Sequence, residues 1–161
     1  MSLETDSLLT KGLQGGFAGG TVMSKVDRGN FEFNANHFEI EDGIYHDEWC
    51  ADRAGGGQEI VIVGDETYTR VYAGGTVPLE ALAELGITKG DVMKFLKKQL
   101  LQNGEKTRLY TNFTPEAEGD WQYSYHVLDT DKEIPITVGK EIIEYQGQLV
   151  FVHDFIISPV D

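Results

Sequence analysis

The stretch GGGQEIVIVGDETYTRVYAGG (55–75) decides the fold class, because it predicts two strands joined by a tight turn. Apolar and β-branched residues fill both halves, and Gly64-Asp65 between them is a typical hairpin turn. A two-residue turn fixes the register: Val63 faces Glu66, Val61 faces Tyr68, and Glu59 faces Arg70. The last of these is a cross-strand ion pair, for which we expect a modest contribution to stability.

Alternation continues on the N-terminal side of this hairpin, in NFEFNANHFEIEDGIYHDEWCAD (30–52). The pattern predicts two or more strands. Phe31 and Phe33 share one face, whereas Phe38 and Ile40 have the opposite parity. We therefore expect a turn or bulge near Asn34 and Asn36 that resets the register.

The C-terminal third also predicts strands, in TRLYTNF (107–113), DWQYSYHVLD (120–129) and a final hairpin, KEIIEY (140–145) with QLVFVHDFII (148–157). The hairpin turns at Gln146-Gly147. Its expected facing pairs are Ile143 with Val150 and Ile142 with Phe151. Because short turns join most strands, the sheet should be largely antiparallel.

Helices are expected in three places. Residues 5–7 offer N-caps for a short helix that ends at Gly15-Gly16, and LEALAEL (79–85) follows Pro78. A second central helix is predicted over 90–102, where Thr88 and Asp91 form a capping box. The fold class is α+β: a largely antiparallel, curved sheet with one or two central helices packed on one face.

The composition fits one domain over residues 1–161, with a short N-terminal helix in 1–14 and first residues open to a vector origin. The formal net charge is −14, so we expect neither direct nucleic-acid binding nor a membrane surface as partner. The N-terminus lacks the pattern of a signal peptide. With a single cysteine, Cys50, the chain is expected to be cytoplasmic.

Two nearly identical segments, FAGGTV (17–22) and YAGGTV (72–77), lie far apart in the chain. Their flanking residues differ, so they do not indicate a duplicated domain. We expect each to end a strand whose glycines allow close backbone approach. We further predict that the two glycine pairs, 19–20 and 74–75, lie near one another or near the same core helix.

The segment YHDEWCAD (45–52) holds the densest set of metal-binding side chains. On a strand, His46, Glu48 and Cys50 point the same way, and such a triplet suits a transition metal. Alternate residues of a strand, however, are about 7 Å apart, which is wide for one ion. A mixed polar edge with a buried thiol is the plainer interpretation, and we expect no metal or other cofactor.

The same segment suggests a small hydrolase as an alternative. Cys50 would be the nucleophile, with His46, His126 or His153 as its base. The acidic pair Asp47-Glu48 could act in acid–base catalysis, although exposed charge is the usual role of such pairs. No local motif supports either reaction, so we expect no catalytic residues.

Aromatic side chains supply the main binding hypothesis. Trp121, Tyr123 and Tyr125 share one strand face, which either fills the core or forms a wall for a ligand. Tyr68 and Tyr72, on another strand, would join them on a curved sheet. The preferred function is a non-catalytic domain for small-molecule binding, regulation or interaction. A structural homodimer formed through an exposed strand edge is the other alternative.

Several stretches together resemble a bacterial family of unknown function, a small α+β domain found alone or behind helix-turn-helix DNA-binding domains. They cover most of residues 15–157: FAGGTV (17–22), GGGQEIVIVGDETYTRVYAGG (55–75), DVMKFLKKQLL (91–101), GDWQYSYHVLD (119–129) and GKEIIEYQGQLVFVHDF (139–155). One loop departs: MSKVDRGN (23–30) stands where the family has a Ser-Arg-Pro-Gly-Ser-like loop. The resemblance implies a bacterial sensor or interaction module and carries no catalytic residues.

Overall fold

The computed structural model describes residues 3–19, 24–40 and 43–160. The helical elements are α1 (Leu3–Leu13), the π-helical turn η1 (Gln14–Ala18), α2 (Leu79–Glu84) and α3 (Lys89–Asn103). The strands are β1 (Ser24–Arg28), β2 (Phe31–Ile40), β3 (Gly43–Ala51), β4 (Ala54–Val63), β5 (Glu66–Thr76), β6 (Trp121–Thr130), β7 (Thr137–Tyr145) and β8 (Gln148–Pro159). The expected α+β class is confirmed.

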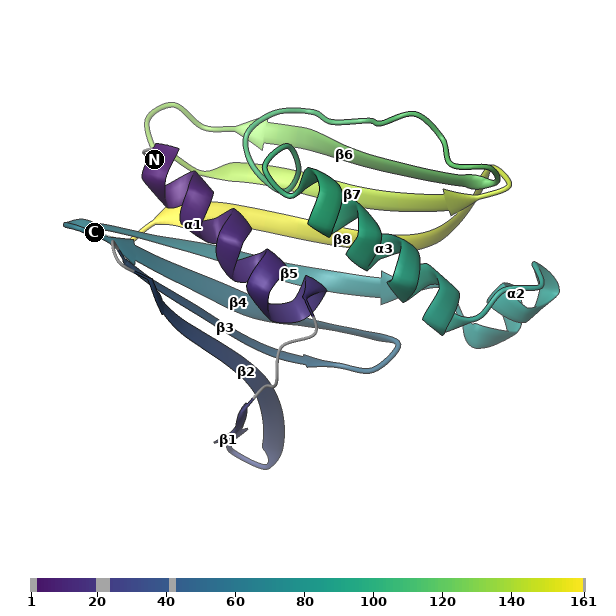
Figure 1. Ribbon diagram of the computed structural model, residues 1–161, viewed down its shortest axis with the longest axis horizontal. Coiled ribbons are helices and arrows are strands. Elements are labelled where there is room, and N and C mark those ends of the chain that lie inside the picture. The colour runs from purple at the N-terminus through teal and green to yellow at the C-terminus, as the bar shows by residue number, and fades with distance from the viewer. Residues whose placement is uncertain (1–2, 20–23, 41–42, 161) are drawn as a thin grey trace.

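The strands form one open sheet in the order β1-β2-β3-β4-β5-β8-β7-β6. Every neighbouring pair is antiparallel, as expected. The C-terminal strand β8 inserts between β5 and β7, so it joins the two halves of the sheet. The connection from β5 to β6 contains α2 and α3, and Figure 1 shows α1 and α3 crossing the sheet on the viewer's side.

The central hairpin has the predicted register. Val63 pairs with Glu66, Val61 with Tyr68 and Glu59 with Arg70. Gly64 takes a positive φ of 57° in the turn, a conformation that favours glycine. The Glu59–Arg70 pair is not a surface pair, however, because both side chains are buried.

Two register predictions were wrong. Strand β2 pairs with β3 without interruption, so Asn34 and Asn36 mark no bulge. In the last hairpin the register shifts between Ile143 and Glu144, and Ile143 pairs with Phe151 instead of Val150. This bulge leaves Val150 as the extra residue, and it lets the consecutive side chains of Val150 and Phe151 both enter the core.

Two local predictions also failed. Residues 107–113 form no strand and pair with β6 only at Phe113–Tyr125, because Arg108 has a positive φ of 60° and turns its side chain inward. The start of FAGGTV is not extended but belongs to η1. Residues 20–22 of this segment lie outside the described ranges. The capping box predicted for the start of α3 is present.

The core consists of two hydrophobic clusters. The larger unites α3 with β6, β7 and β8, through side chains such as Leu96, Leu100, Tyr123 and Phe155. The smaller joins α1 to β3 and β4, through Leu8, Leu9, Tyr45, Val61 and Leu109. The interior also holds buried charged side chains, among them Glu59, Arg70, Arg108 and Glu141. None of the helices in the described ranges is long and apolar enough to span a membrane.

Candidate ligand-binding site

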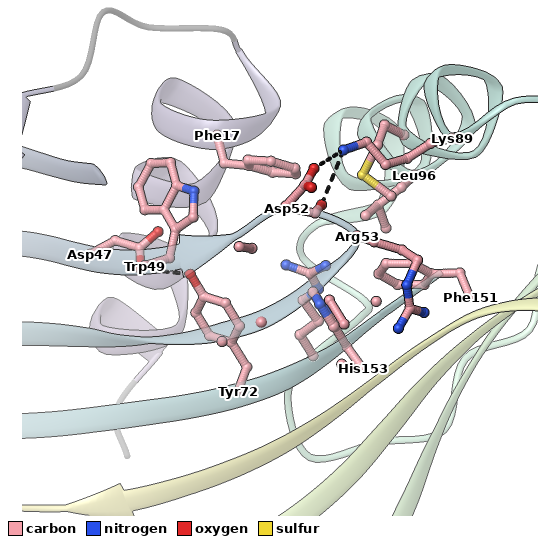
Figure 2. A pocket seen from close by; sticks show the side chains of 18 of the residues that line it. Phe17, Asp47, Trp49, Asp52, Arg53, Tyr72, Lys89, Leu96, Phe151 and His153 are labelled. Carbon is pink, nitrogen blue, oxygen red and sulfur yellow. Dashed lines mark hydrogen bonds and ion pairs between the residues drawn. The ribbon is translucent and has the colours of Figure 1, made fainter. Parts of the chain in front are cut away.

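A cavity of about 200 Å³ lies between the strands β3, β4, β5 and β8 and the helical elements η1 and α3. Strand alternation places its walls, since Tyr45, Asp47 and Trp49 of β3 all point inward. The exposed residues Asp52 and Arg53, in the β3–β4 connection, line the end that opens to solvent (Figure 2).

Apolar and aromatic side chains form one part of the wall. Phe17 of η1 packs edge-on against Trp49, with 6.4 Å between the ring centroids. Leu96 of α3 and Phe151 of β8 also line the cavity. Figure 2 shows Phe17, Trp49 and Tyr72 on the same side of this space. Such surfaces suit an apolar ring.

Asp47 and Tyr72 form the nearest polar part of the wall. The Tyr72 hydroxyl donates a hydrogen bond of 3.0 Å to Asp47 Oδ1. Burial, and then the charge of Glu59, raise the pKa of the Asp47 carboxyl to about 8. Burial and the same two carboxylates raise the pKa of the Tyr72 hydroxyl as well. At neutral pH the Asp47 carboxyl is therefore mostly protonated.

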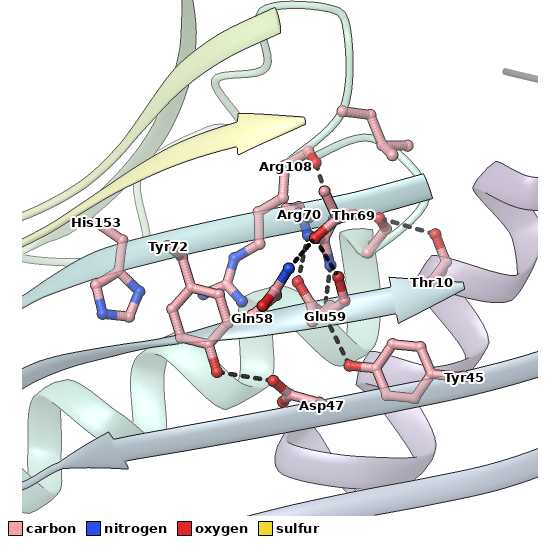
Figure 3. A network of polar contacts seen from close by, with 12 residues as sticks. Thr10, Tyr45, Asp47, Gln58, Glu59, Thr69, Arg70, Tyr72, Arg108 and His153 are labelled. Atoms are coloured by element: carbon pink, nitrogen blue, oxygen red, sulfur yellow. Dashed lines mark hydrogen bonds and ion pairs between the residues drawn. The ribbon is translucent and has the colours of Figure 1, made fainter. Parts of the chain in front are cut away.

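Two buried ion pairs stand behind these groups (Figure 3). Arg70 binds Glu59 through Nε and through Nη2 at 2.7 Å, and Tyr45 donates to the same carboxylate at 2.7 Å. Arg108 binds Glu141 at 2.9 and 2.7 Å. Burial alone would raise the pKa of Glu141, but the Arg108 guanidinium outweighs it and the pKa is lowered. The Glu141 carboxylate therefore remains charged.

Residue 108 links the two pairs. Arg70 donates a third hydrogen bond, of 2.9 Å, from Nη1 to the main-chain oxygen of Arg108. This bond explains why the segment after α3 enters the interior instead of forming a strand. Tyr123 adds a hydrogen bond of 2.6 Å to Glu141. The result is a rigid polar layer whose charges are paired.

His153 of β8 also lines the cavity, and its Nδ1 atom is buried without a hydrogen-bond partner among the described residues. This nitrogen is 3.8 Å from Glu141 Oε2. Burial and then Arg108 lower the pKa of the imidazole to about 4, so the ring is neutral at physiological pH. A buried nitrogen without a partner is costly unless another molecule bonds to it.

The aromatic residues expected to form one wall lie in several places. Of the five, Tyr72 lines the cavity. Tyr123 and Tyr125 are fully buried, and the Tyr125 hydroxyl donates to the Leu109 carbonyl at 2.7 Å. Tyr68 packs against the smaller cluster, and Trp121 stacks on Phe95 at 5.0 Å.

His46, Glu48 and Cys50 point to the opposite face of β3 from Asp47, as alternation requires. His46 Nε2 lies 2.9 Å from Glu48 Oε1, and Arg28 also binds Glu48. Over residues 3–19, 24–40 and 43–160, no group of three or more His, Cys, Asp or Glu side chains is arranged to hold a metal ion. His153 faces the cavity and is therefore not on the side of Cys50.

The repeated segments meet at this site. Phe17 of the first and Gly74 and Gly75 of the second line the same cavity, beside Met93 of α3. Gly19 does not line the cavity, and Gly20 lies outside the described residues, so the prediction about the two glycine pairs stays a prediction. The glycines of β5 are needed for close approach, because a Cβ on Gly74 would lie 1.9 Å from the carbonyl oxygen of Val152.

Sequence reasoning missed most of the polar wall. Asp47 was treated as part of an exposed acidic pair, and Arg108 as a strand residue. The signal available for Asp47 was its position between two aromatic residues of the same parity, Tyr45 and Trp49, which marks an inward face. Arg108 had no such signal, because its side chain is directed inward by an irregular backbone.

No protein-family model, curated protein or solved structure matches this chain. What the site does must therefore be argued from its geometry.

Proposed function

We propose that the chain is a non-catalytic domain that binds a small molecule in the cavity beside Tyr72. The observation that carries this proposal is a cavity lined mainly by apolar and aromatic side chains, with the hydrogen-bonded pair Asp47 and Tyr72 in its wall. His153 also lines the cavity, although its Nδ1 atom is itself buried. A few convergent polar groups in a mostly apolar cavity are typical of ligand sites.

The volume limits the ligand. A cavity of about 150 Å³ accommodates benzene, so the 200 Å³ present here suits a single ring with one or two substituents. Such a ligand would pack against Phe17 and Trp49 and would hydrogen-bond to the polar wall. A larger ligand would have to displace side chains.

The proposal also requires the architecture expected from the sequence, a curved sheet with helices packed on one face. The hydrophobic cluster that α3 shares with β6, β7 and β8 supports this arrangement, as does the smaller cluster that α1 shares with β3 and β4. The likeness to a bacterial family of sensor or interaction domains agrees with ligand binding. We keep that likeness as a proposal.

A fragment library of single-ring compounds, screened by ligand-observed NMR, tests the function. Met93→Trp should fill the cavity, because Met93 lines it from α3. Leu101→Trp is the matched control on the same helix, since Leu101 is exposed and does not line this cavity. Hits should bind wild type and Leu101→Trp and should lose binding to Met93→Trp.

The proposal is overturned if no single-ring compound binds, or if all hits bind Met93→Trp as well as wild type. Circular dichroism of both variants should show the wild-type fold, because each substitution changes one side chain of α3.

A further inference from the structure

Most of the carboxyl groups that line the cavity or lie behind it bind a cationic side chain. Glu59 binds Arg70 and Glu141 binds Arg108 in the interior, while Asp52 binds Lys89 at the rim. Arg53, exposed at the rim, donates to the Thr76 carbonyl and not to a carboxylate. Asp47 is the one buried carboxyl group of this set without a cationic side chain bound to it, in the part of the chain that the structure describes.

The interior is therefore one positive charge short when Asp47 is ionised. This part of the interior contains three buried carboxyl groups, those of Asp47, Glu59 and Glu141. It contains two buried guanidinium groups, those of Arg70 and Arg108. Asp47 meets this deficit by remaining protonated, as its raised pKa indicates. A bound cation would remove the deficit and allow the carboxylate to form.

The rest of the wall also suits a cation. Trp49 and Tyr72 line the same cavity as Asp47, and the face of an aromatic ring attracts positive charge. Phe17 lines it too, and the Lys97 ammonium already lies over the Phe17 ring, 4.9 Å from its centroid. The whole chain has a formal net charge of −14, which favours the approach of cations.

An anionic ligand fits less well. The buried guanidinium groups of Arg70 and Arg108 already bind carboxylates through two nitrogens each, and the guanidinium of Arg53 at the rim donates to the Thr76 carbonyl. An anion would compete with those carboxylates and would also lie beside Asp47 and Glu59.

We propose that the ligand of this cavity is a small aromatic or heteroaromatic cation, such as a ring bearing a protonated amine, and that Asp47 is its counter-ion. This inference rests on the proposed function, since it specifies the ligand of the same cavity.

Three probes of similar size and different charge test it: benzylamine, benzyl alcohol and benzoate. Binding is measured by isothermal titration calorimetry at pH 7 on wild type, Asp47→Asn and the control Asp154→Asn. Asp154 is the matched residue, because it is also an aspartate, but it does not line the cavity, its side chain is 55 % exposed and it binds Lys140. We expect benzylamine to bind wild type most tightly.

Asp47→Asn should weaken the affinity for benzylamine by about tenfold or more, since it removes a charged hydrogen-bond acceptor in a buried site. The same substitution should change the affinity for benzyl alcohol by less than about threefold. Asp154→Asn should leave all three affinities nearly unchanged. A second measurement needs no variant: binding of benzylamine at pH 7 should release a proton, detected as a heat that depends on the ionisation enthalpy of the buffer, because Asp47 ionises.

The outcomes separate the two proposals. If benzyl alcohol or benzoate binds in a manner that Met93→Trp abolishes, while benzylamine binds more weakly than either, the cavity binds ligands but the inference about charge is wrong. Benzylamine binding that neither releases a proton nor responds to Asp47→Asn is equally incompatible with the inference. If none of the three probes binds wild type and the fragment screen also finds nothing, both proposals fail.

Discussion

Asp47 makes folding depend on pH in the direction opposite to most carboxylates. Its pKa is about 8 in the folded protein, against an ordinary value of 3.8. Between these two values the folded state holds a proton that the unfolded state has lost, so the contribution of Asp47 to stability falls as pH rises. Below about pH 4 both states are protonated, and this contribution is at its maximum.

Asp47→Asn should remove this dependence. Relative to wild type, the variant should gain on the order of 1 kcal/mol of unfolding free energy per pH unit between about pH 4 and pH 8. Urea denaturation of both proteins at pH 5, 6, 7 and 8 measures the difference. Parallel profiles over that range would mean that the Asp47 carboxyl is ionised in the folded protein.

Neutralising the Glu141 side chain should lower the free energy of unfolding more than most single substitutions would. It is fully buried and bound to Arg108 and Tyr123. Glu141→Gln leaves the Arg108 guanidinium without its counter-ion, which should cost about 3 kcal/mol. Urea denaturation at pH 7 measures the loss.

The control for this change is an ion pair next to Glu141, between β7 and β8. Lys140 and Asp154 form an ion pair with partly exposed side chains, so Asp154→Asn should cost less than about 1 kcal/mol. Equal losses in the two variants would contradict the view that burial gives the Glu141 pair its importance.

The sequence predicts that Glu59 and Arg70 pair, but not that they are buried. In this hairpin hydrophobicity misidentifies the inner face: Glu59 and Arg70 are each 1 % exposed, whereas Ile62 and Val71 are 37 % and 43 % exposed. Alternation tells which residues share a face, and the cross-strand partners follow from the turn. Which face is covered depends on elements far away in sequence, and the polar interior reverses the usual rule.

At the scale of elements, the best predictions are those fixed by local geometry. The β4–β5 register follows from a two-residue turn, and the start of α3 follows from the Thr88–Asp91 capping box. The failures occur where distant contacts decide the backbone. Residues 107–113 alternate like a strand, yet Arg108 leaves that conformation to bind Glu141 and to accept a hydrogen bond from Arg70.

The glycines of β5 should be essential for its pairing with β8. Gly74 has a φ of 155°, and a Cβ there would collide with the Val152 carbonyl and the His153 ring. Gly74→Ala should therefore destabilise the protein by about 3 kcal/mol or prevent folding, through backbone strain and displacement of β8 together. The midpoint of thermal unfolding reports the loss.

Gly64→Ala is the control that separates the backbone strain of a positive φ from the collision of a new Cβ with its neighbours. Gly64 has a φ of 57°, but nothing lies within 4 Å of the position of its Cβ. Its replacement should cost only about 1 kcal/mol, from the left-handed conformation alone. If Gly74→Ala is no more harmful than Gly64→Ala, then β5 and β8 do not approach as closely as the sheet requires.

At the scale of the whole molecule, an antiparallel α+β fold can be predicted from the spacing of turns, but the strand order cannot. Nothing local indicates that β8 inserts between β5 and β7. That insertion brings His153 next to Tyr72 and Glu141 next to the interior. The candidate site is therefore a product of topology, and among its polar groups the sequence assigns only Tyr72 to ligand binding.

The open sheet has two edges, β1 and β6, which bear on the homodimer alternative. Part of the β6 edge is already occupied, since Phe113 and Tyr125 exchange main-chain hydrogen bonds of 2.9 and 2.8 Å. Further along, the main-chain N–H of Val127 donates to Asn112 Oδ1 at 2.7 Å. The β1 edge carries charged side chains, including Lys25 and Asp27, which discourage pairing with another sheet.

We therefore expect a monomer. Light scattering at increasing protein concentration should give a constant mass near 17.9 kDa. Asn112→Ala removes the acceptor that covers Val127, and so frees one donor on the β6 edge for pairing between copies. Any concentration-dependent increase in mass should be larger in this variant than in wild type. A wild-type dimer that Asn112→Ala leaves unchanged would show that the copies associate through a surface other than the β6 edge.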